Sequence, residues 1–135
     1  MKVVLDTNVL VSGIFFSGPP AKILRPWSHG KFRLVLSPEI LDEYSRVAAE
    51  LAGKFPDIDI RRILDLVVVR SEVCSPAALP HQVCEDPHDD KFFAAAIGSR
   101  TKIIVSGDKH LLSVSGYQGV SVLTPRQFVV RYLSE

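Results

Sequence analysis

Residues 2–8 read KVVLDTN, and the rest of the chain is organised around this stretch. Its first four residues are almost all apolar and partly β-branched, which is typical of a strand buried on both faces of a parallel sheet. Asp6, Thr7 and Asn8 follow this strand directly. Open parallel sheets bind ligands at the carboxyl ends of their strands, so Asp6 is a candidate site residue. Asp6 could equally cap a helix that begins near Asn8.

Apolar runs with strand character alternate with segments of helical periodicity along the chain. This alternation predicts an α/β fold with a mainly parallel sheet. Pro26 lies inside one helical pattern and predicts a kink or an end there, and Asp57 is the expected cap of a later helix. The expected strands cover residues 2–5, 32–36, 69–73, 101–105 and 120–123, and the expected helices cover residues 8–16, 21–29, 39–51, 57–66, 88–99, 108–112 and 124–133.

The composition is that of an ordinary globular protein. With 135 residues the chain can form a proper core, and we expect a single domain over residues 1–135. There is no apolar run of roughly 18 residues and no signal-peptide pattern, so we expect no membrane contact and a cytoplasmic location. The net charge of +1 does not by itself indicate nucleic-acid binding. Cys74 and Cys84 lack zinc-site spacing and are expected to be reduced thiols.

The expected topology sends four acids to one rim of the sheet. Asp6 and Asp108 directly follow expected strands, and Asp90 lies in the first turn of a helix that begins at the same edge. Glu43 lies in the second turn of another such helix, within roughly 8 Å of its start. Each acid also has a purely structural interpretation: Glu43 as a solvated helix residue, and Asp108 as the cap of the helix that follows it.

Like charges on one rim repel each other, so a fold keeps them together only where a cation or a function offsets the repulsion. Oxygen-only ligands select hard cations, here Mg²⁺ or Mn²⁺. Two such ions about 4 Å apart can activate a water and neutralise the leaving oxygen in phosphodiester hydrolysis. Thr7, Asn8 and Ser106 could orient waters or carboxylates around such ions, and Ser106 could instead donate to a phosphate.

Four motifs, taken in order, resemble those of PIN domains, a family of metal-dependent ribonucleases with a quartet of acids. The resemblance covers nearly the whole chain, and the combination is specific although each motif alone is weak. The motifs are LDTN at residues 5–8, EILDE at residues 39–43, DPHDDKFFAAA at residues 86–96 and VSGD at residues 105–108.

The resemblance implies a compact three-layer α/β/α sandwich that acts on RNA as an Mg²⁺- or Mn²⁺-dependent endoribonuclease. Asp90 is preferred to Asp89 because the family's acid stands four residues before the Ala-Ala pair. Asp86 and Asp89 remain candidate substitutes, although they can also be read as the cap and the capping-box acid of the following helix. Ser106 matches a position usually held by Thr or Ser. The catalytic and metal-binding quartet is expected to be Asp6, Glu43, Asp90 and Asp108.

The resemblance also implies partners. Many small bacterial and archaeal PIN proteins are VapC-like toxins of toxin–antitoxin pairs, and the family commonly dimerises, so a protein antitoxin and a homodimer are expected partners. Trp27 and the pair Phe15 and Phe16 lie in two short adjacent helices. We expect part of this apolar surface to be an interface, with ordinary core packing as the alternative.

Two rival functions remain open. A phosphotransferase or phosphatase of the haloacid-dehalogenase type would use Asp6 as a nucleophile, but such enzymes want a second Asp two residues later, where this chain has Asn8. A catalytically silent PIN-fold module would bind RNA or protein without cleavage, and the complete quartet argues against it. In the nuclease interpretation, Lys91, Lys109 and Arg100 are expected to contact phosphates on or near the rim.

Overall fold

The computed structural model describes residues 1–133, and its centre is a five-stranded sheet in which every neighbouring pair of strands is parallel. The strand of residues 2–5 is central, because the order is β3-β2-β1-β4-β5. Val3, Val4 and Leu5 are completely buried there, as expected for a strand covered on both faces. The strands are β1 (Lys2–Leu5), β2 (Arg33–Leu36), β3 (Ser71–Val73), β4 (Ile103–Val105) and β5 (Ser121–Leu123).

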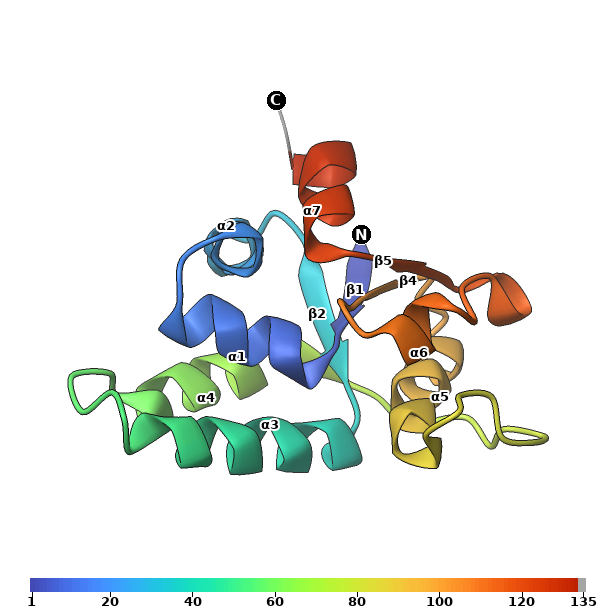
Figure 1. Cartoon of the computed structure of the whole chain (residues 1–135), viewed down its shortest axis with the longest axis horizontal. Helices are drawn as coiled ribbons and strands as arrows, with labels where there is room; N and C mark the ends of the chain where they lie inside the picture. Colours follow the sequence, from blue (N-terminus) through green and yellow to red (C-terminus); the bar gives the residue numbers. More distant parts are fainter. Residues whose placement is uncertain (134–135) are drawn as a thin grey trace.

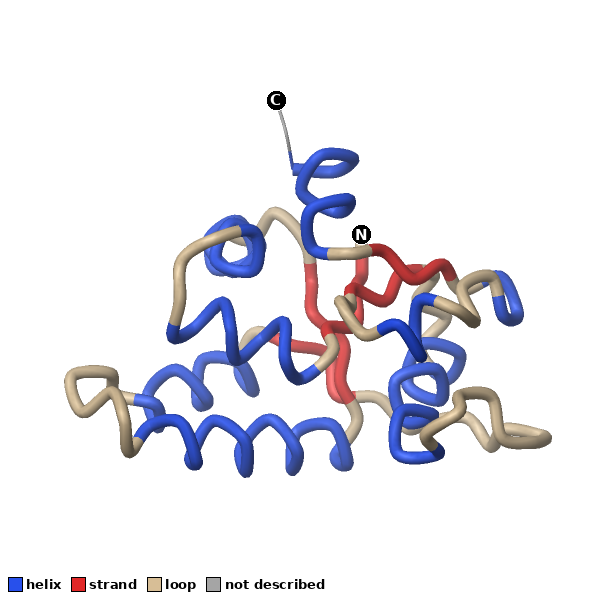
Figure 2. Tube along the Cα trace, viewed as in Figure 1, coloured by secondary structure: helices blue, strands red, loops and turns tan. Residues whose placement is uncertain are grey.

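Helices cover both faces of this sheet. Within residues 1–133 the α-helices are α1 (Thr7–Phe15), α2 (Pro19–Ser28), α3 (Pro38–Ala52), α4 (Ile60–Val69), α5 (Asp90–Gly98), α6 (Lys109–Leu112) and α7 (Pro125–Phe128). The short helices are η1 (Pro87–Asp89), η2 (Tyr117–Gly119) and the π-helical η3 (Val129–Leu133). In Figure 1, α1 to α4 lie on one side of the central strands and α5 and α6 on the other. Figure 2 shows the strands between the two helical groups, which confirms the predicted α/β/α sandwich.

The direction of the chain across the sheet changes between β1 and β4. The connection after β1 leads to β2 on one side, whereas the connection after β4 leads to β5 on the other. Because crossovers between parallel strands are right-handed, the helices after these two strands leave toward opposite faces. Ligands bind open parallel sheets in the crevice that this divergence creates at the carboxyl ends of the strands. Asp6 and Ser106 follow β1 and β4 directly, so the fold places both at the switch point.

Large apolar side chains fill the space between the layers. Phe92 and Phe93 of α5 and Phe128 of α7 are completely or almost completely buried in the main core. Phe15 is 8% exposed in a smaller cluster, and Trp27 is 5% exposed in the main core. The interface prediction is therefore wrong for Phe15 and Trp27, which the monomer already buries, and it stays a prediction for Phe16. Phe16 is 51% exposed and packs edge-on against the Phe55 ring.

Several predicted boundaries shift by a few residues. The helix expected from Asp57 begins at Ile60 and is capped by Asp59, whose side chain accepts from the Arg62 amide. It continues to Val69 although β-branched residues favour strands, because Val67 is completely buried against the core. Helix α2 runs through Pro26 to Ser28; the proline lies in the last turn, where it removes one hydrogen bond. None of the helices in residues 1–133 is long and apolar enough to cross a membrane.

Candidate active site

Asp6 is held in place at the switch point by its neighbour across the sheet. Asp6 is only 6% exposed and its side chain makes no capping hydrogen bond to α1, so the simple helix-cap interpretation is not realised. Instead, the buried Ser106 hydroxyl donates to Asp6 Oδ2 at 2.7 Å, and the same Ser106 oxygen accepts from the Asp108 amide at 2.9 Å. Ser106 therefore links Asp6 to the chain around Asp108, and its burial leaves it turned toward Asp6 rather than toward solvent.

Glu43 comes to the same place because α3 is anchored to the end of β1. Ser37 caps α3 by accepting from the Ile40 amide, and the buried Tyr44 hydroxyl donates to the Leu5 carbonyl at 2.5 Å. This bond ties the second turn of α3 to the residue just before Asp6. Glu43, the neighbour of Tyr44, then accepts a hydrogen bond from the Thr7 hydroxyl.

Lys91 is the cation that balances Glu43. Its Nζ donates to Glu43 Oε1 at 2.7 Å, and its side chain is only 8% exposed. Both oxygens of Glu43 are thus occupied, one by Lys91 and one by Thr7. Lys91 was expected to contact phosphate, but in this structure its ammonium group is committed to a carboxylate of the site. A hollow of about 400 Å³ opens beside this pair, lined by Glu39, Asp42, Glu43, Arg46, His88 and Lys91.

The ionisation of the site reflects burial and mutual repulsion. Burial raises the pKa of Asp6, and the charges of Asp108 and Glu43 raise it further, against the lowering effect of the Ser106 hydrogen bond. Burial also acts to raise the pKa of Glu43, but the hydrogen bonds from Lys91 and Thr7 and the charges of Lys91 and Arg46 outweigh it, so the pKa of Glu43 is lowered. Neighbouring cations therefore offset the charge of Glu43, whereas neighbouring carboxylates oppose the ionisation of Asp6.

Asp89 and Asp90 have different environments although they are adjacent. The Asp90 carboxylate accepts from the backbone amides of Val83 and Cys84, at 3.0 and 2.7 Å, and so holds the loop that precedes η1. Burial and then the charges of Asp108, Asp6 and Asp86 raise the pKa of Asp89 to about 6. Asp89 is therefore electrostatically coupled to Asp6 and Asp108.

Asp86 and Asp108 both act as helix caps. Asp86 accepts from the His88 amide at 3.0 Å, and Asp108 accepts from the His110 amide at 2.8 Å. Asp86 is exposed and its charge helps to raise the pKa of Asp89, whereas the charge of Asp108 helps to raise the pKa of Asp6. Capping and a place at the rim are compatible for Asp108, because a carboxylate that accepts one amide proton keeps other lone pairs.

Of the other predicted residues, two lie on the rim side of the sheet and one lies at the opposite edge. Asn8 lies exposed in the first turn of α1, and Lys109 lies exposed at the start of α6, both on the rim side. Arg100 does not lie near the rim: it follows α5 and precedes β4, at the amino edge of the sheet. The expectation for Arg100 was wrong because α5 runs antiparallel to the strands and carries its carboxyl end to the opposite edge.

Cysteine chemistry does not contribute to this site. Cys74 and Cys84 are both free thiols. Cys84 is buried next to Asp90, and burial together with that carboxylate raises the pKa of its thiol to about 12. A thiol with this pKa stays protonated at neutral pH and is a poor nucleophile.

The donor chemistry at the rim suits a hard divalent cation. The donors are carboxylate oxygens, and the uncompensated burial of Asp6 beside Asp108 is the electrostatic environment that a bound cation relieves. Within residues 1–133 no three His, Cys, Asp or Glu side chains already stand in a metal-binding arrangement. Instead, Lys91 donates to Glu43, and the amides of Val83 and Cys84 donate to Asp90.

The fold and the site define an α/β protein with an acidic rim at the switch point of a parallel sheet. A family model described as PIN domain matches residues 2–110, which is most of the chain. The chain therefore belongs to the PIN-domain family, and the resemblance of its motifs is confirmed. PIN domains are typically nucleases that bind RNA and use divalent metal ions. Comparison with curated proteins and with solved structures finds no match.

Proposed function

We propose that this protein is an Mg²⁺- or Mn²⁺-dependent endoribonuclease that hydrolyses RNA phosphodiester bonds. The observation that carries the proposal is the position of Asp6: it is buried at the switch point, held by Ser106, and coupled to Asp108 and Glu43. A structural acid gains nothing from this environment, because each neighbouring carboxylate makes its ionisation less favourable.

In this proposal Asp6, Glu43, Asp90 and Asp108 hold the cation, and Asp89 shares the site. Asp90 keeps free lone pairs although it accepts two amide protons. Asp89 is included because its pKa responds to Asp6 and Asp108. When bound, Mg²⁺ or Mn²⁺ supplies activation of water and neutralisation of the leaving oxygen.

The protein's own residues provide the fixed geometry that such chemistry needs. Ser106 orients Asp6, while Thr7 and Lys91 hold the two oxygens of Glu43. Groups locked in this way stay in the reactive arrangement without reorganising during the reaction. Lys91 also offsets one negative charge of the acidic rim through its pairing with Glu43.

Incubation of the purified protein with single-stranded RNA tests the proposal. We expect internal cleavage with Mn²⁺ or Mg²⁺ and none with EDTA. RNA binding without cleavage at any divalent concentration would instead identify a silent PIN module. Hydrolysis of a small phosphate monoester with a trappable aspartyl intermediate would identify a phosphatase; the Asn8 side chain, two residues after Asp6, argues against that rival.

The biological extension of the proposal is that this nuclease is the toxin of a toxin–antitoxin pair. Its support is the family resemblance of the motifs. Co-expression with the product of the adjacent gene tests it: we expect a complex that no longer cleaves RNA. A neighbouring product that neither binds the protein nor changes its cleavage rate would refute this extension and leave the nuclease proposal intact.

A further inference from the structure

Two segments of the chain carry only positive charge. Residues 7–38 and residues 109–133 contain no Asp or Glu, although acids and bases are nearly balanced in the whole chain. The basic residues of the two segments are Lys22, Arg25, Lys31, Arg33, Lys109, Arg126 and Arg131. The near-neutral net charge therefore conceals a strong separation of charge along the sequence.

The fold brings these two segments together on one side of the molecule. Helix α2 packs against α7 and η3. Beneath them the buried rings of Phe32 and Phe128 meet edge to face, with centroids 5.4 Å apart, and Phe128 also contacts the ring of Tyr132. The surface above therefore rests on core packing, which fixes the relative positions of the basic residues on α2, α7 and η3.

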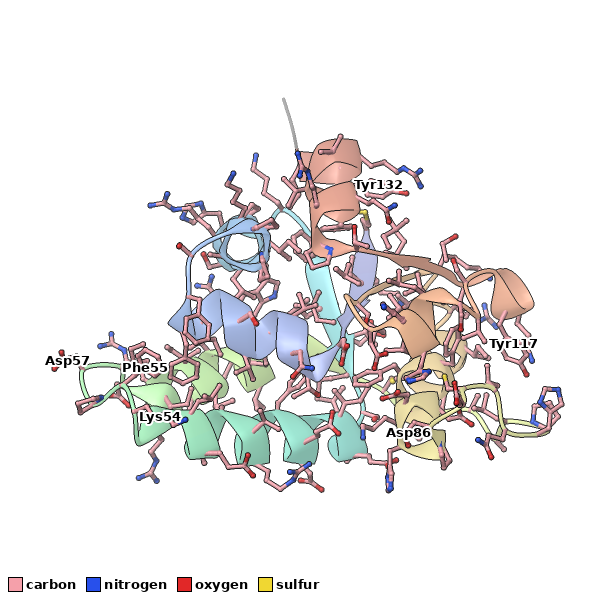
Figure 3. All side chains as sticks on the ribbon, viewed as in Figure 1. Lys54, Phe55, Asp57, Asp86, Tyr117 and Tyr132 are labelled. Atoms are coloured by element: carbon pink, nitrogen blue, oxygen red, sulfur yellow. The ribbon has the colours of Figure 1, made fainter. Side chains whose placement is uncertain are left out.

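We call this surface the basic face; it consists of Lys22, Arg25, His29, Lys31, Arg126, Arg131 and Tyr132. All seven residues are exposed, and within residues 1–133 none of the Lys, Arg and His side chains among them forms an ion pair. Figure 3 labels Tyr132 at the upper end of the molecule, where nitrogen-tipped side chains project from α2 and from the helices after β5.

Two hollows of the basic face lie where α2 meets the C-terminal helices α7 and η3. One, of about 330 Å³, is lined by Arg25, His29, Lys31 and Tyr132 together with Met1, Pro26 and Leu133. The other, of about 310 Å³, lies between Lys22 and Arg126, next to Pro19. Cations placed around an exposed aromatic ring form the combination that binds single-stranded nucleic acid, in which the cations contact phosphates and the ring stacks on a base.

The first hollow lies at the opposite edge of the sheet from the acids. Lys31 precedes β2 and Met1 precedes β1, whereas Asp6 follows β1. A strand of four residues separates these two edges by roughly 13 Å. An RNA segment on this hollow therefore lies outside the acidic rim, at least roughly 13 Å from Asp6.

We propose that the basic face binds the phosphodiester backbone of a single-stranded RNA segment remote from the scissile bond, with Tyr132 stacking on a base. This inference rests on the proposed function for the identity of the RNA as substrate. A protein partner fits less well, because Met1, Val130 and Tyr132 are the large apolar side chains exposed there, which is little apolar area for the core of a protein interface.

Fluorescence anisotropy with a labelled single-stranded RNA of about 20 nucleotides, in EDTA, tests this binding separately from cleavage. The variant Arg25→Glu/Arg126→Glu should weaken binding at least tenfold and reduce the salt dependence of the dissociation constant, because phosphate contacts are lost. Lys22→Glu/Lys31→Glu should do the same, and Tyr132→Ala should weaken binding about fivefold or more through lost stacking.

Arg61→Glu/Arg62→Glu is the matched control. Both arginines are exposed on α4, away from the basic face, and the charge change is identical. It should bind RNA within about twofold of wild type. Equal RNA affinity and salt dependence for wild type and both charge-reversal variants of the basic face would overturn the proposal. The proposal would also be overturned if the basic-face variants lost binding to poly-glutamate but kept the RNA affinity of wild type. That result would identify the face as a protein-docking surface.

Cleavage assays separate this inference from the proposed function. Arg25→Glu/Arg126→Glu should cleave a trinucleotide at the wild-type rate but show a raised KM for long RNA. If no RNA is cleaved by wild type, the nuclease proposal fails while the binding measurement still decides the role of the basic face.

Discussion

Replacing Ser106 with Ala tests whether Asp6 is held as an ionised group. Ser106 is completely buried and donates at 2.7 Å to Asp6 Oδ2. A hydrogen bond to a charged group contributes about 1.5–3 kcal/mol, and its loss leaves the buried carboxylate without that donor. For a domain of this size 1 kcal/mol corresponds to roughly 3–5 °C, so the melting temperature of Ser106→Ala should fall by about 5–15 °C at pH 8.

A double-mutant cycle isolates the interaction. Asp6→Ala, Ser106→Ala and the double variant should give a coupling free energy between Asp6 and Ser106 of about 1.5–3 kcal/mol. The coupling should shrink as the pH falls through the raised pKa of Asp6, because a protonated carboxyl accepts a weaker hydrogen bond. Ser113→Ala is the control, since the exposed Ser113 hydroxyl donates to the His110 carbonyl, and it should cost less than about 0.5 kcal/mol. A coupling below about 0.5 kcal/mol at pH 8 would refute the reasoning.

Three further predictions concern the other acids. Glu43→Gln removes the anion that pairs with the nearly buried Lys91 and should lower the free energy of unfolding in urea by roughly 1–3 kcal/mol. The control Glu50→Gln, at an exposed position, should lower it by less than about 0.5 kcal/mol. Equal losses for the two variants would contradict the pairing. The pKa of Asp89 is raised above its ordinary value of 3.8 to about 6, so ionising it costs stability. The contribution of Asp89 to the stability of the metal-free protein should therefore fall as the pH rises from 3.8 to about 6, and Asp89→Asn should lose that part of the pH dependence in thermal melts. Asp90→Asn should destabilise the metal-free protein by about 1–3 kcal/mol, because the single oxygen of the Asn side chain cannot replace both carboxylate oxygens that accept from the loop N–H groups. If Asp90→Asn were as stable as Asp89→Asn, Asp90 would not hold the loop.

The parts of the fold that follow from short-range patterns could be predicted from the sequence. The apolar strand before Asp6 and the serine–proline start of α3 appear where expected, because burial and capping act within a few residues. The strand order was not predicted, because it depends on how segments far apart in the sequence pair across the sheet. The boundaries of α4 were less predictable, because burial of Val67 prolongs the helix against its local propensity.

The meeting of three acids at one edge of the sheet was predictable, but the contacts that each acid makes were not. Following strands and helices to the sheet edge brought Asp6, Glu43 and Asp108 together, and their couplings are present in the structure. The pairing of Lys91 with Glu43 spans 48 positions in the chain and depends on packing of α3 near α5. The different environments of Asp89 and Asp90 were also not predictable. Adjacent residues at the start of a helix point in different directions, and packing determines which of the two faces the other acids.

The central claim is that Asp6 is a functional acid, and the variant Asp6→Asn tests it most directly. Asn keeps the size of the side chain and removes one negative charge, so the metal-free protein should be as stable as wild type or more stable. Millimolar Mn²⁺ should stabilise the wild-type protein by mass action and the variant much less. Asp57→Asn is the control, since Asp57 lies in the loop before α4, far from the rim (Figure 3).

The decisive measurement is the rate of RNA cleavage by Asp6→Asn and Asp57→Asn under the same Mn²⁺ concentration. We predict a fall of at least ~100-fold for Asp6→Asn, equivalent to about 2.7 kcal/mol of barrier, and an unchanged rate for Asp57→Asn. Cleavage by Asp6→Asn at the wild-type rate would contradict the claim that Asp6 belongs to the catalytic site.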